Sequence, residues 1–275
     1  MVTKKKVIDI KPEKTTGTAL TKAKKTDVGA PGDWRSELAK YAQKTVKMEE
    51  NTATGNRIST RNGRLTYHDT PLKNNEMHVI ILAALVENAY YNGPYDPDAP
   101  RSPVCFAFSE DGEDMEPHEK SHERQSDSCE GCQWNKWGSA DQGRGKACKN
   151  IRRLAVIPMG EGPGVEEIKA AEIATLTVPV TSVKGYSAFA KELTTHAGLP
   201  PFAYRVRIWL EDDAKSQFRV RFEAADRKPL PEKLMPALIE RVKEAEKLLD
   251  QPYVYIEPEE AAPKRGAGKK KAGKY

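Results

Sequence analysis

The sequence has no hydrophobic run long enough to cross a membrane as a helix. The longest uninterrupted apolar run in the 275 residues is Val79 to Val86, only 8 residues, whereas a spanning helix needs about 20. The lysines near the N-terminus are followed by no apolar stretch, so we expect no secretory signal. The protein is therefore expected in the cytoplasm, where thiols stay reduced.

Familiar catalytic motifs are also missing. The sequence contains no H-E-x-x-H, no G-x-S-x-G and no phosphate-binding glycine loop. Nucleobase deaminases combine H-x-E with P-C-x-x-C, but here His118 and His122 are each followed directly by Glu, and Ser128 stands where that motif has Pro. We therefore predict a protein that is not an enzyme, with a small zinc hydrolase as a distant alternative.

Positive charge is concentrated at the two ends of the chain. Residues 1–30 carry eight Lys against three acids, and residues 264–275 carry six Lys or Arg and no acid. The residues between them hold a net −6, although the whole chain is +5. Basic ends are typical of arms that contact a polyanion, nucleic acid first, or of solubilising tails. We expect disordered basic arms at 1–30 and 256–275 around a single domain at 31–255.

The pattern of this domain is mainly β. Asn62-Gly63 is a strong hairpin signal, because a type I′ turn needs two positive φ angles. Residues 77–91 suit a bent barrel strand, with a buried helix as the alternative. Thr181 or Ser182 is the predicted cap of a helix that Gly198 ends. The predicted strands are 57–68 (a hairpin), 77–91, 103–108, 151–158, 173–180, 203–210 and 217–223, and the predicted helices are 33–48, 183–197 and 232–249. This order excludes a doubly wound sheet and predicts an α+β fold, an OB-fold-like β-barrel with appended helices and an inserted loop at 105–150.

All four cysteines lie within 44 residues, as Cys105-x23-Cys129-x2-Cys132-x15-Cys148. The Cys-x2-Cys step lets two thiolates grip one tetrahedral zinc, and a distant pair closes the site. Residues 109–150 show no hydrophobic periodicity, so a metal would supply folding free energy that a core does not. We predict one structural Zn²⁺, with two disulfides or four unrelated thiols as alternatives. His118 or His122 is the alternate ligand to Cys105.

The hairpin at 203–223 has a face that suits single-stranded nucleic acid. Strict alternation places five cationic or aromatic side chains opposite the apolar ones: Arg205, Arg207, Trp209, Arg219 and Arg221. Cations that follow phosphates and rings that stack on bases bind single strands without sequence preference. The alternative is an exposed sheet face on which the arginines pair with Glu211 and Glu223.

A second basic patch surrounds the predicted zinc loop. Its members are Trp134, Trp137, Arg144, Lys146, Lys149, Arg152 and Arg153. The two tryptophans either cap the zinc site or offer a stacking surface. Residues 109–130 oppose this patch, with nine acids against Lys120 and Arg124. That acidic stretch would shield the site, mimic a strand or bind another protein.

Residues from about 75 to 160 carry a more specific resemblance. It rests on Pro103-Val104-Cys105-Phe106, Ser109-Glu110-Asp111-Gly112, Gln125, Cys129-Glu130-Gly131-Cys132, Asn135, Gly138-Ser139, Lys146-Ala147-Cys148 and Arg152-Arg153-Leu154. This run resembles a group of tailed-bacteriophage proteins associated with phage single-stranded DNA-binding proteins of the OB-fold type. Many of those have Trp where this chain has Phe106, and often an acidic tail where this one ends in Lys and Arg.

The resemblance implies zinc on the four cysteines and a role in phage DNA replication or recombination within the host bacterial cytoplasm. We therefore predict sequence-independent single-stranded DNA binding, with phage replisome or recombination proteins as further partners and no membrane. The alternative function is a replication or transcription cofactor that docks a polymerase through the acidic zinc loop.

Overall fold

The computed structural model describes residues 56–93, 101–141, 144–226 and 228–253, together with Leu38 and Tyr41. The predicted basic arms lie outside these residues, as does the predicted helix at 33–48 except for Leu38 and Tyr41, which are helical. The chain divides into two compact units, residues 1–52 and 53–275, and every described strand belongs to the second. No helix in the described part is both long and apolar enough to cross a bilayer.

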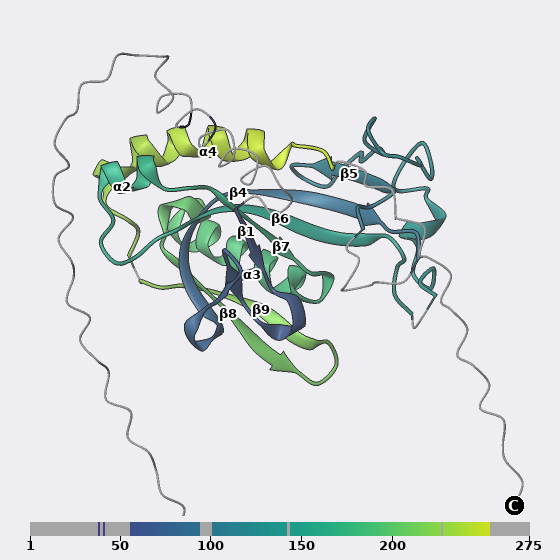
Figure 1. Cartoon of the computed structure of the whole chain (residues 1–275), viewed down its shortest axis with the longest axis horizontal. Coiled ribbons are helices and arrows are strands. Elements are labelled where there is room, and N and C mark those ends of the chain that lie inside the picture. Colours follow the sequence, from purple (N-terminus) through teal and green to yellow (C-terminus); the bar gives the residue numbers. More distant parts are fainter. Residues whose placement is uncertain are drawn as a thin grey trace, which may run out of the picture. The chain divides into compact units, whose positions relative to one another are not determined.

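The described part of the second unit is mainly β, with nine strands in one curled sheet (Figure 1). The strand order is β3-β2-β1-β7-β6-β4-β8-β9, and β5 pairs with β4. The bounds are β1 Arg57–Ser59, β2 Thr66–Tyr67, β3 Thr70–Pro71, β4 Glu76–Tyr90, β5 Cys105–Ser109, β6 Lys149–Pro158, β7 Ala174–Val178, β8 Val206–Asp213 and β9 Gln217–Ala224. The prediction of a β-rich α+β fold is confirmed.

β4 is the long central strand of this sheet. β6 pairs along one of its edges, while β8 pairs with the start of the other edge and β5 with its end. Its register against β6 shifts between Ile81 and Ala83, a bulge that bends the strand. Neighbouring side chains, such as Val79 and Ile80, enter two different cores. Burial on both faces explains why this segment is a continuous apolar run, and the alternative of a buried helix is wrong.

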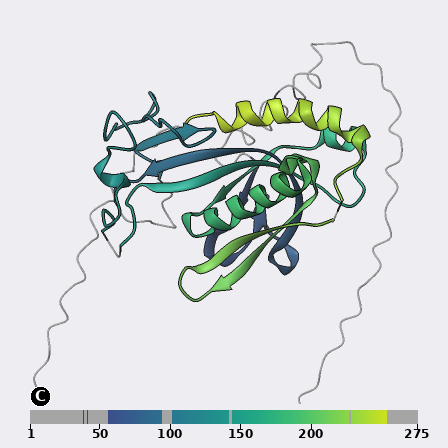
Figure 2. The same cartoon turned by 180° about the vertical axis from the view of Figure 1, so that it is seen from behind.

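Helices cover both faces of the curled sheet (Figures 1 and 2). The α-helices are α2 Val165–Ala170, α3 Val180–Ala197 and α4 Met235–Leu249, and the 3₁₀ turns are η1 Arg61–Gly63, η2 Lys73–Asn75, η3 Gln133–Asn135, η4 Pro201–Ala203 and η5 Glu232–Leu234. Tyr186 of α3 packs in the core with Val79 and Leu176, and Leu238 of α4 packs in the opposite core with Ile80 and Ile157. The sheet is thus a half-barrel enclosed between α3 and α4.

Local signals fix several ends and turns of these elements. Asn62 (φ 55°) and Gly63 (φ 68°) take the two positive angles predicted for the hairpin turn. Gly63 lies next to β9, since a Cβ atom built at Gly63 would be 3.8 Å from the Phe218 ring. The turn between β1 and β2 and the strand β9, which belong to opposite ends of the strand order, therefore curl toward each other. Gly198, at φ 66°, ends α3 as predicted.

The start of α3 departs from the prediction. The helix begins at Val180 with Pro179 as its N-cap, not with Thr181 or Ser182. Ser182 is buried instead, and its hydroxyl oxygen accepts the backbone N–H of Val220 at 2.9 Å. The hydroxyl therefore joins the helix to β9, a role that local sequence does not signal.

Candidate cysteine centre and nucleic-acid surface

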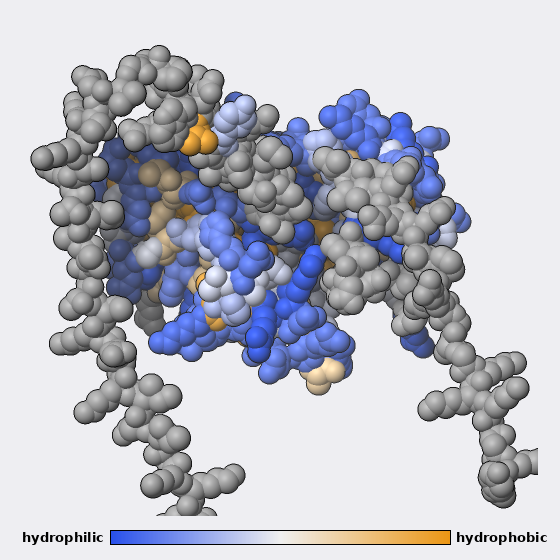
Figure 3. All heavy atoms as spheres, viewed as in Figure 1, coloured by the Kyte–Doolittle hydropathy of each residue, from blue (hydrophilic) through white to orange (hydrophobic). Residues whose placement is uncertain are grey.

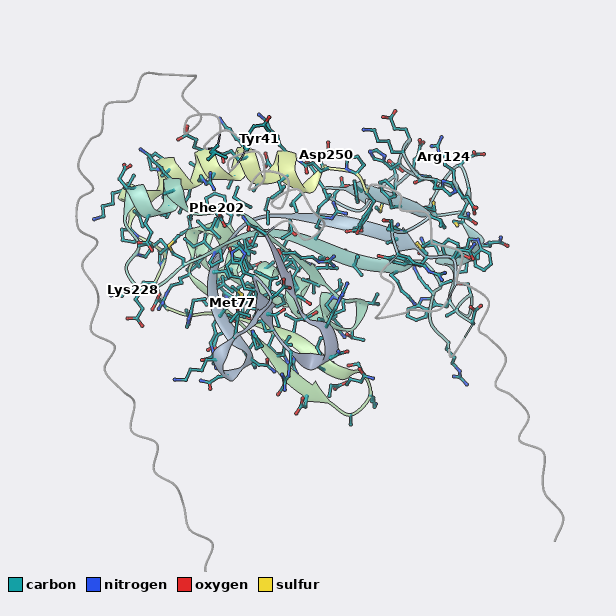
Figure 4. The ribbon with its side chains drawn as sticks, viewed as in Figure 1. Tyr41, Met77, Arg124, Phe202, Lys228 and Asp250 are labelled. Atoms are coloured by element: carbon teal, nitrogen blue, oxygen red, sulfur yellow. The ribbon has the colours of Figure 1, made fainter. Side chains whose placement is uncertain are left out.

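The four cysteines come together at the far end of β4. β5 and β6 flank this end, so that Cys105, the first residue of β5, pairs with Tyr90, and Cys148 directly precedes β6. We call residues 105–141 and 144–148 the cysteine lobe. Figure 4 shows Arg124 on this lobe, away from Met77 in the half-barrel, and the visible face of the lobe in Figure 3 is mainly hydrophilic.

All four cysteines are buried and free, and all four line one small cavity. The other residues that line it are Asn88, Tyr90, Phe106, Ala107, Pro117, Gln125 and Asn135. Backbone hydrogen bonds hold the loop around this cavity: the N–H of Cys129 donates to the carbonyl of Met115, and the N–H of Cys148 to that of Trp134, both at 2.9 Å. The sequence spacing therefore corresponds to a single cluster in space.

Burial raises the pKa of two of these four thiols, Cys148 and Cys129. Burial first, and then the neighbouring Cys129, Cys132 and Cys105, raise the pKa of Cys148 to about 12, while the charge of Lys146 acts in the opposite direction. Burial also raises the pKa of Cys129, against a hydrogen bond from Asn88 that lowers it. Metal binding would have to displace these protons.

The donor set fits a structural zinc ion, because four thiols share one cavity in a lobe with little core of its own. The small cluster of Ala107, Met115 and Cys129 is the core that the lobe has. Within the described ranges, no group of three or more His, Cys, Asp or Glu side chains has an arrangement that could hold a metal ion. The structure therefore shows four thiols around one cavity, but not four thiols already arranged as the ligands of an ion.

The two alternate histidines are not among the described residues that line this cavity. The His118 ring stacks on Phe106 with 5.0 Å between centroids, and its Nδ1 accepts the backbone N–H of Lys120 at 3.0 Å. Neither His118 nor His122 belongs to the described lining of the cysteine cavity. The structure thus brings together the four cysteines and not a set of three cysteines and a histidine.

The predicted hairpin face is present, but its arginines are paired with carboxylates. Arg207 donates through Nε to Glu76 at 2.9 Å and lies 4.8 Å over the half-buried Trp209 ring. The remaining pairs are Arg207 with Glu223, Arg219 with Asp213, and Arg221 with Glu211. This matches the alternative of an exposed face of ion pairs, and little positive charge is left for phosphates.

Arg205 is a correction to the predicted surface. It is buried, because it lies before β8 begins and folds against the turn after β9. Its guanidinium makes two hydrogen bonds to Asp226, at 2.9 and 3.2 Å. The same contact lowers the pKa of Asp226.

Arg153 is a second correction, because it lies inside the molecule. Its Nε donates to Glu87 at 3.0 Å, and Nη1 donates to the backbone carbonyls of Leu249 and Gln251. The guanidinium lies over the rings of both Phe108 and Tyr253, 4.4 and 4.7 Å from their centroids. Arg153 therefore ties the end of α4 to the sheet. Its neighbour Arg152 is half-buried.

The two lobe tryptophans differ in role. Trp134 stacks on Tyr90 at 5.0 Å, and its Nε1 donates to Gln125 at 2.9 Å, so it packs against two residues that line the cysteine cavity. Trp137 is 77% exposed. The structure thereby separates one tryptophan that packs beside the cysteine cavity from one that is exposed.

One cation lies over the ring of the exposed tryptophan, and three further cationic residues belong to the same stretch of the chain. Lys146 lies 6.0 Å over the Trp137 ring, the N–H of Gly138 donates to the Arg144 carbonyl at 3.3 Å, and Lys149 Nζ donates to the Lys146 carbonyl at 3.2 Å. We call Lys136, Trp137, Arg144, Lys146 and Lys149 the Trp137 surface. None of its cations forms an ion pair with any described residue.

Some residues of this site were not predicted. Lys136 is exposed beside Trp137 and could have been found from adjacency alone. Asn88, Asn135 and Asn150 form a polar network beside the cavity. The sequence offered one signal for that network, the position of Asn135 between Cys132 and Cys148.

No protein-family model, no curated protein and no solved structure matches the chain. The resemblance to phage single-stranded DNA-binding proteins therefore stays a prediction from the sequence.

Proposed function

We propose that the protein binds single-stranded DNA without sequence preference through the Trp137 surface. The observation that carries this proposal is Trp137 itself, 77% exposed among cations that form no ion pair in the described part. An indole ring exposed in water has apolar area to bury, and stacking on a base contributes about 1–3 kcal/mol. The nearby ammonium and guanidinium groups suit phosphates on either side of a stacked base.

Zinc on Cys105, Cys129, Cys132 and Cys148 is part of this proposal. Cys105 and Cys148 belong to strand ends, whereas Cys129 and Cys132 belong to the loop. A bound ion would supply folding free energy by joining the loop to the sheet. The chain's own residues would then present Trp137 from a braced loop.

The finer fold interpretation and the biological role rest on weaker support. The curled sheet is consistent with an OB-fold-like barrel, and the basic ends of the sequence suit a polyanion. The role in phage DNA replication or recombination depends on the sequence resemblance alone. The paired arginines of β8 and β9 favour the Trp137 surface over the hairpin face as the DNA contact.

The test compares the zinc-loaded full chain on a single-stranded and a duplex 30-mer over a salt series. We expect strong preference for the single strand and a linear loss of affinity on a log–log salt plot. Trp137→Ala should weaken binding about 5- to 150-fold. Ile239→Ala removes an exposed apolar side chain from α4 and should change nothing. Equal affinity of Trp137→Ala and the unmodified chain would refute the proposed contact.

A second candidate function is supported by a separate surface. Nine carboxylates of the cysteine lobe are exposed, and none is ion-paired in the described ranges: Glu110, Asp111, Glu113, Asp114, Glu116, Glu119, Glu123, Asp127 and Glu130. Such a surface suits a docking protein that engages a polymerase. Tight binding to a polymerase together with little affinity for DNA would favour this function.

A further inference from the structure

Lys146 differs from the other cations of the Trp137 surface in that two side chains hold its ammonium group. It is half-buried, and its ammonium donates to Asn135 Oδ1 at 3.1 Å and to Asn150 Oδ1 at 2.9 Å. Arg144 and Lys149 are exposed in the same region. Two of the three ammonium donors of Lys146 are therefore already engaged within the protein.

The partners of Lys146 lead to the cysteine cavity. Asn150 on β6 donates through Nδ2 to Asn135 at 3.0 Å and to Asn88 on β4. Asn88 and Asn135 both line the cavity. Asn135 Nδ2 donates to the Cys129 carbonyl at 2.8 Å, and Asn88 Nδ2 donates to Met115 Sδ at 3.2 Å. A continuous network thus joins the ammonium to Cys129.

A cysteine centre that holds zinc would carry negative charge, and the Lys146 ammonium is a suitable counter-charge. Four thiolates around Zn²⁺ carry a net −2, and the stretch 109–130, which contains Cys129, is itself strongly negative. A buried net charge is costly without an opposite charge nearby. Residues around the ligands of a metal often set its affinity by orienting those ligands and balancing their charge.

We propose that Lys146 is a positioning residue and counter-charge of the cysteine centre, acting through Asn135 and Asn150, and is not a phosphate contact. This inference rests on the zinc of the proposed function. Because the same ammonium lies over the Trp137 ring, Lys146 also links the state of the centre to the stacking surface. Loss of the metal then weakens DNA binding through the position of Trp137.

The test separates the two roles by using the neighbouring Lys149 as a control. Co²⁺ affinity and the Co²⁺ absorption spectrum of the full chain are measured for Lys146→Gln, Lys146→Arg and Lys149→Gln. Lys146→Gln should lower metal affinity about 10- to 100-fold and alter the spectrum, and Lys146→Arg should recover part of the affinity. Lys149→Gln should bind Co²⁺ as the unmodified chain does.

Salt dependence of oligo-dT binding at saturating metal provides the second readout. Lys149→Gln should flatten the log–log slope by about 0.7, the loss of one phosphate contact on a single strand, while Lys146→Gln keeps the slope. Should Lys146→Gln not fold, Asn150→Ala removes one of the two anchors and should lower Co²⁺ affinity in the same direction without changing the slope.

Unaltered Co²⁺ affinity in these variants, with a flatter slope for Lys146→Gln, would overturn the inference and make Lys146 a phosphate contact. A chain that binds no metal at its cysteines would overturn it too. A chain that binds metal but no DNA would refute the proposed function alone, since the Co²⁺ measurements still decide the role of Lys146.

Discussion

Glu87 and Arg153 form a buried ion pair, with Arg153 Nε 3.0 Å from Glu87 Oε2, on the strands that lead into the cysteine lobe. Glu87 is fully buried, and the Tyr253 hydroxyl donates to its second carboxylate oxygen. Arg153 also reaches two backbone carbonyls at the end of α4. The pair therefore connects β4, β6 and the chain that follows α4.

Breaking this pair should destabilise the fold strongly. Arg153→Met leaves Glu87 buried without its partner, which costs about 3–5 kcal/mol in free energy of unfolding. Urea denaturation measures this loss. Arg221→Gln, which breaks the exposed pair with Glu211, is the control and should cost at most about 1 kcal/mol. Comparable losses for the two variants would show that the buried pair has no special role.

The cysteine centre should bind one metal ion per chain. We expect about one zinc per chain by metal analysis of purified protein, and Cys132→Ser should lose the metal and partly unfold the lobe. Near-ultraviolet circular dichroism would detect the lobe through Trp134, which stacks on Tyr90, a residue of the cavity lining. Protein that folds fully without bound metal would contradict the structural role.

The pair of Arg205 and Asp226 should make stability depend on acidic pH. The hydrogen bonds from Arg205 lower the pKa of Asp226 from its ordinary 3.8. A lowered folded-state pKa stabilises the protein above the ordinary value, and this stability is lost as pH falls through the lowered value. Urea unfolding from about pH 7 to about pH 3 should show a smaller acid loss for Asp226→Asn. If Asp226→Asn and the unmodified chain lose the same stability between about pH 7 and about pH 3, this contribution is ruled out.

The hairpin variants should affect stability more than DNA binding. Trp209 is half-buried beneath Arg207, so Trp209→Ala should cost about 1–3 kcal/mol of unfolding free energy. Arg221 is already paired with Glu211, so Arg221→Gln should leave the salt slope of oligo-dT binding nearly unchanged. A slope flattened by about 0.7 for Arg221→Gln would return the DNA contact to the hairpin face.

Local chemistry made several elements predictable. Asn62-Gly63 and Gly198 take positive φ angles that other residues adopt with strain, so the turn and the helix end follow from residue type. Residues 77–91 were predicted as a bent strand from their length and β-rich composition, and β4 is that strand. The cysteine cluster followed from ligand spacing.

Long-range pairing made the surfaces unpredictable. Arg207 meets Glu76 from 131 residues away and Arg153 meets Glu87 from 66 residues away, because sheet register places them together. Strand alternation predicted which face of β8 holds the arginines. It did not predict which acidic side chains lie beside them. The distinction between Trp134 and Trp137 likewise depends on Tyr90 from another strand.

The proposed role of Trp137 is tested most directly by tryptophan fluorescence during titration with oligo-dT. The zinc-loaded full chain should lose fluorescence as bases stack on the exposed ring. Trp137→Phe should abolish most of this quenching, and Trp209→Phe should keep it. Quenching that persists in Trp137→Phe and disappears in Trp209→Phe would contradict the proposed surface.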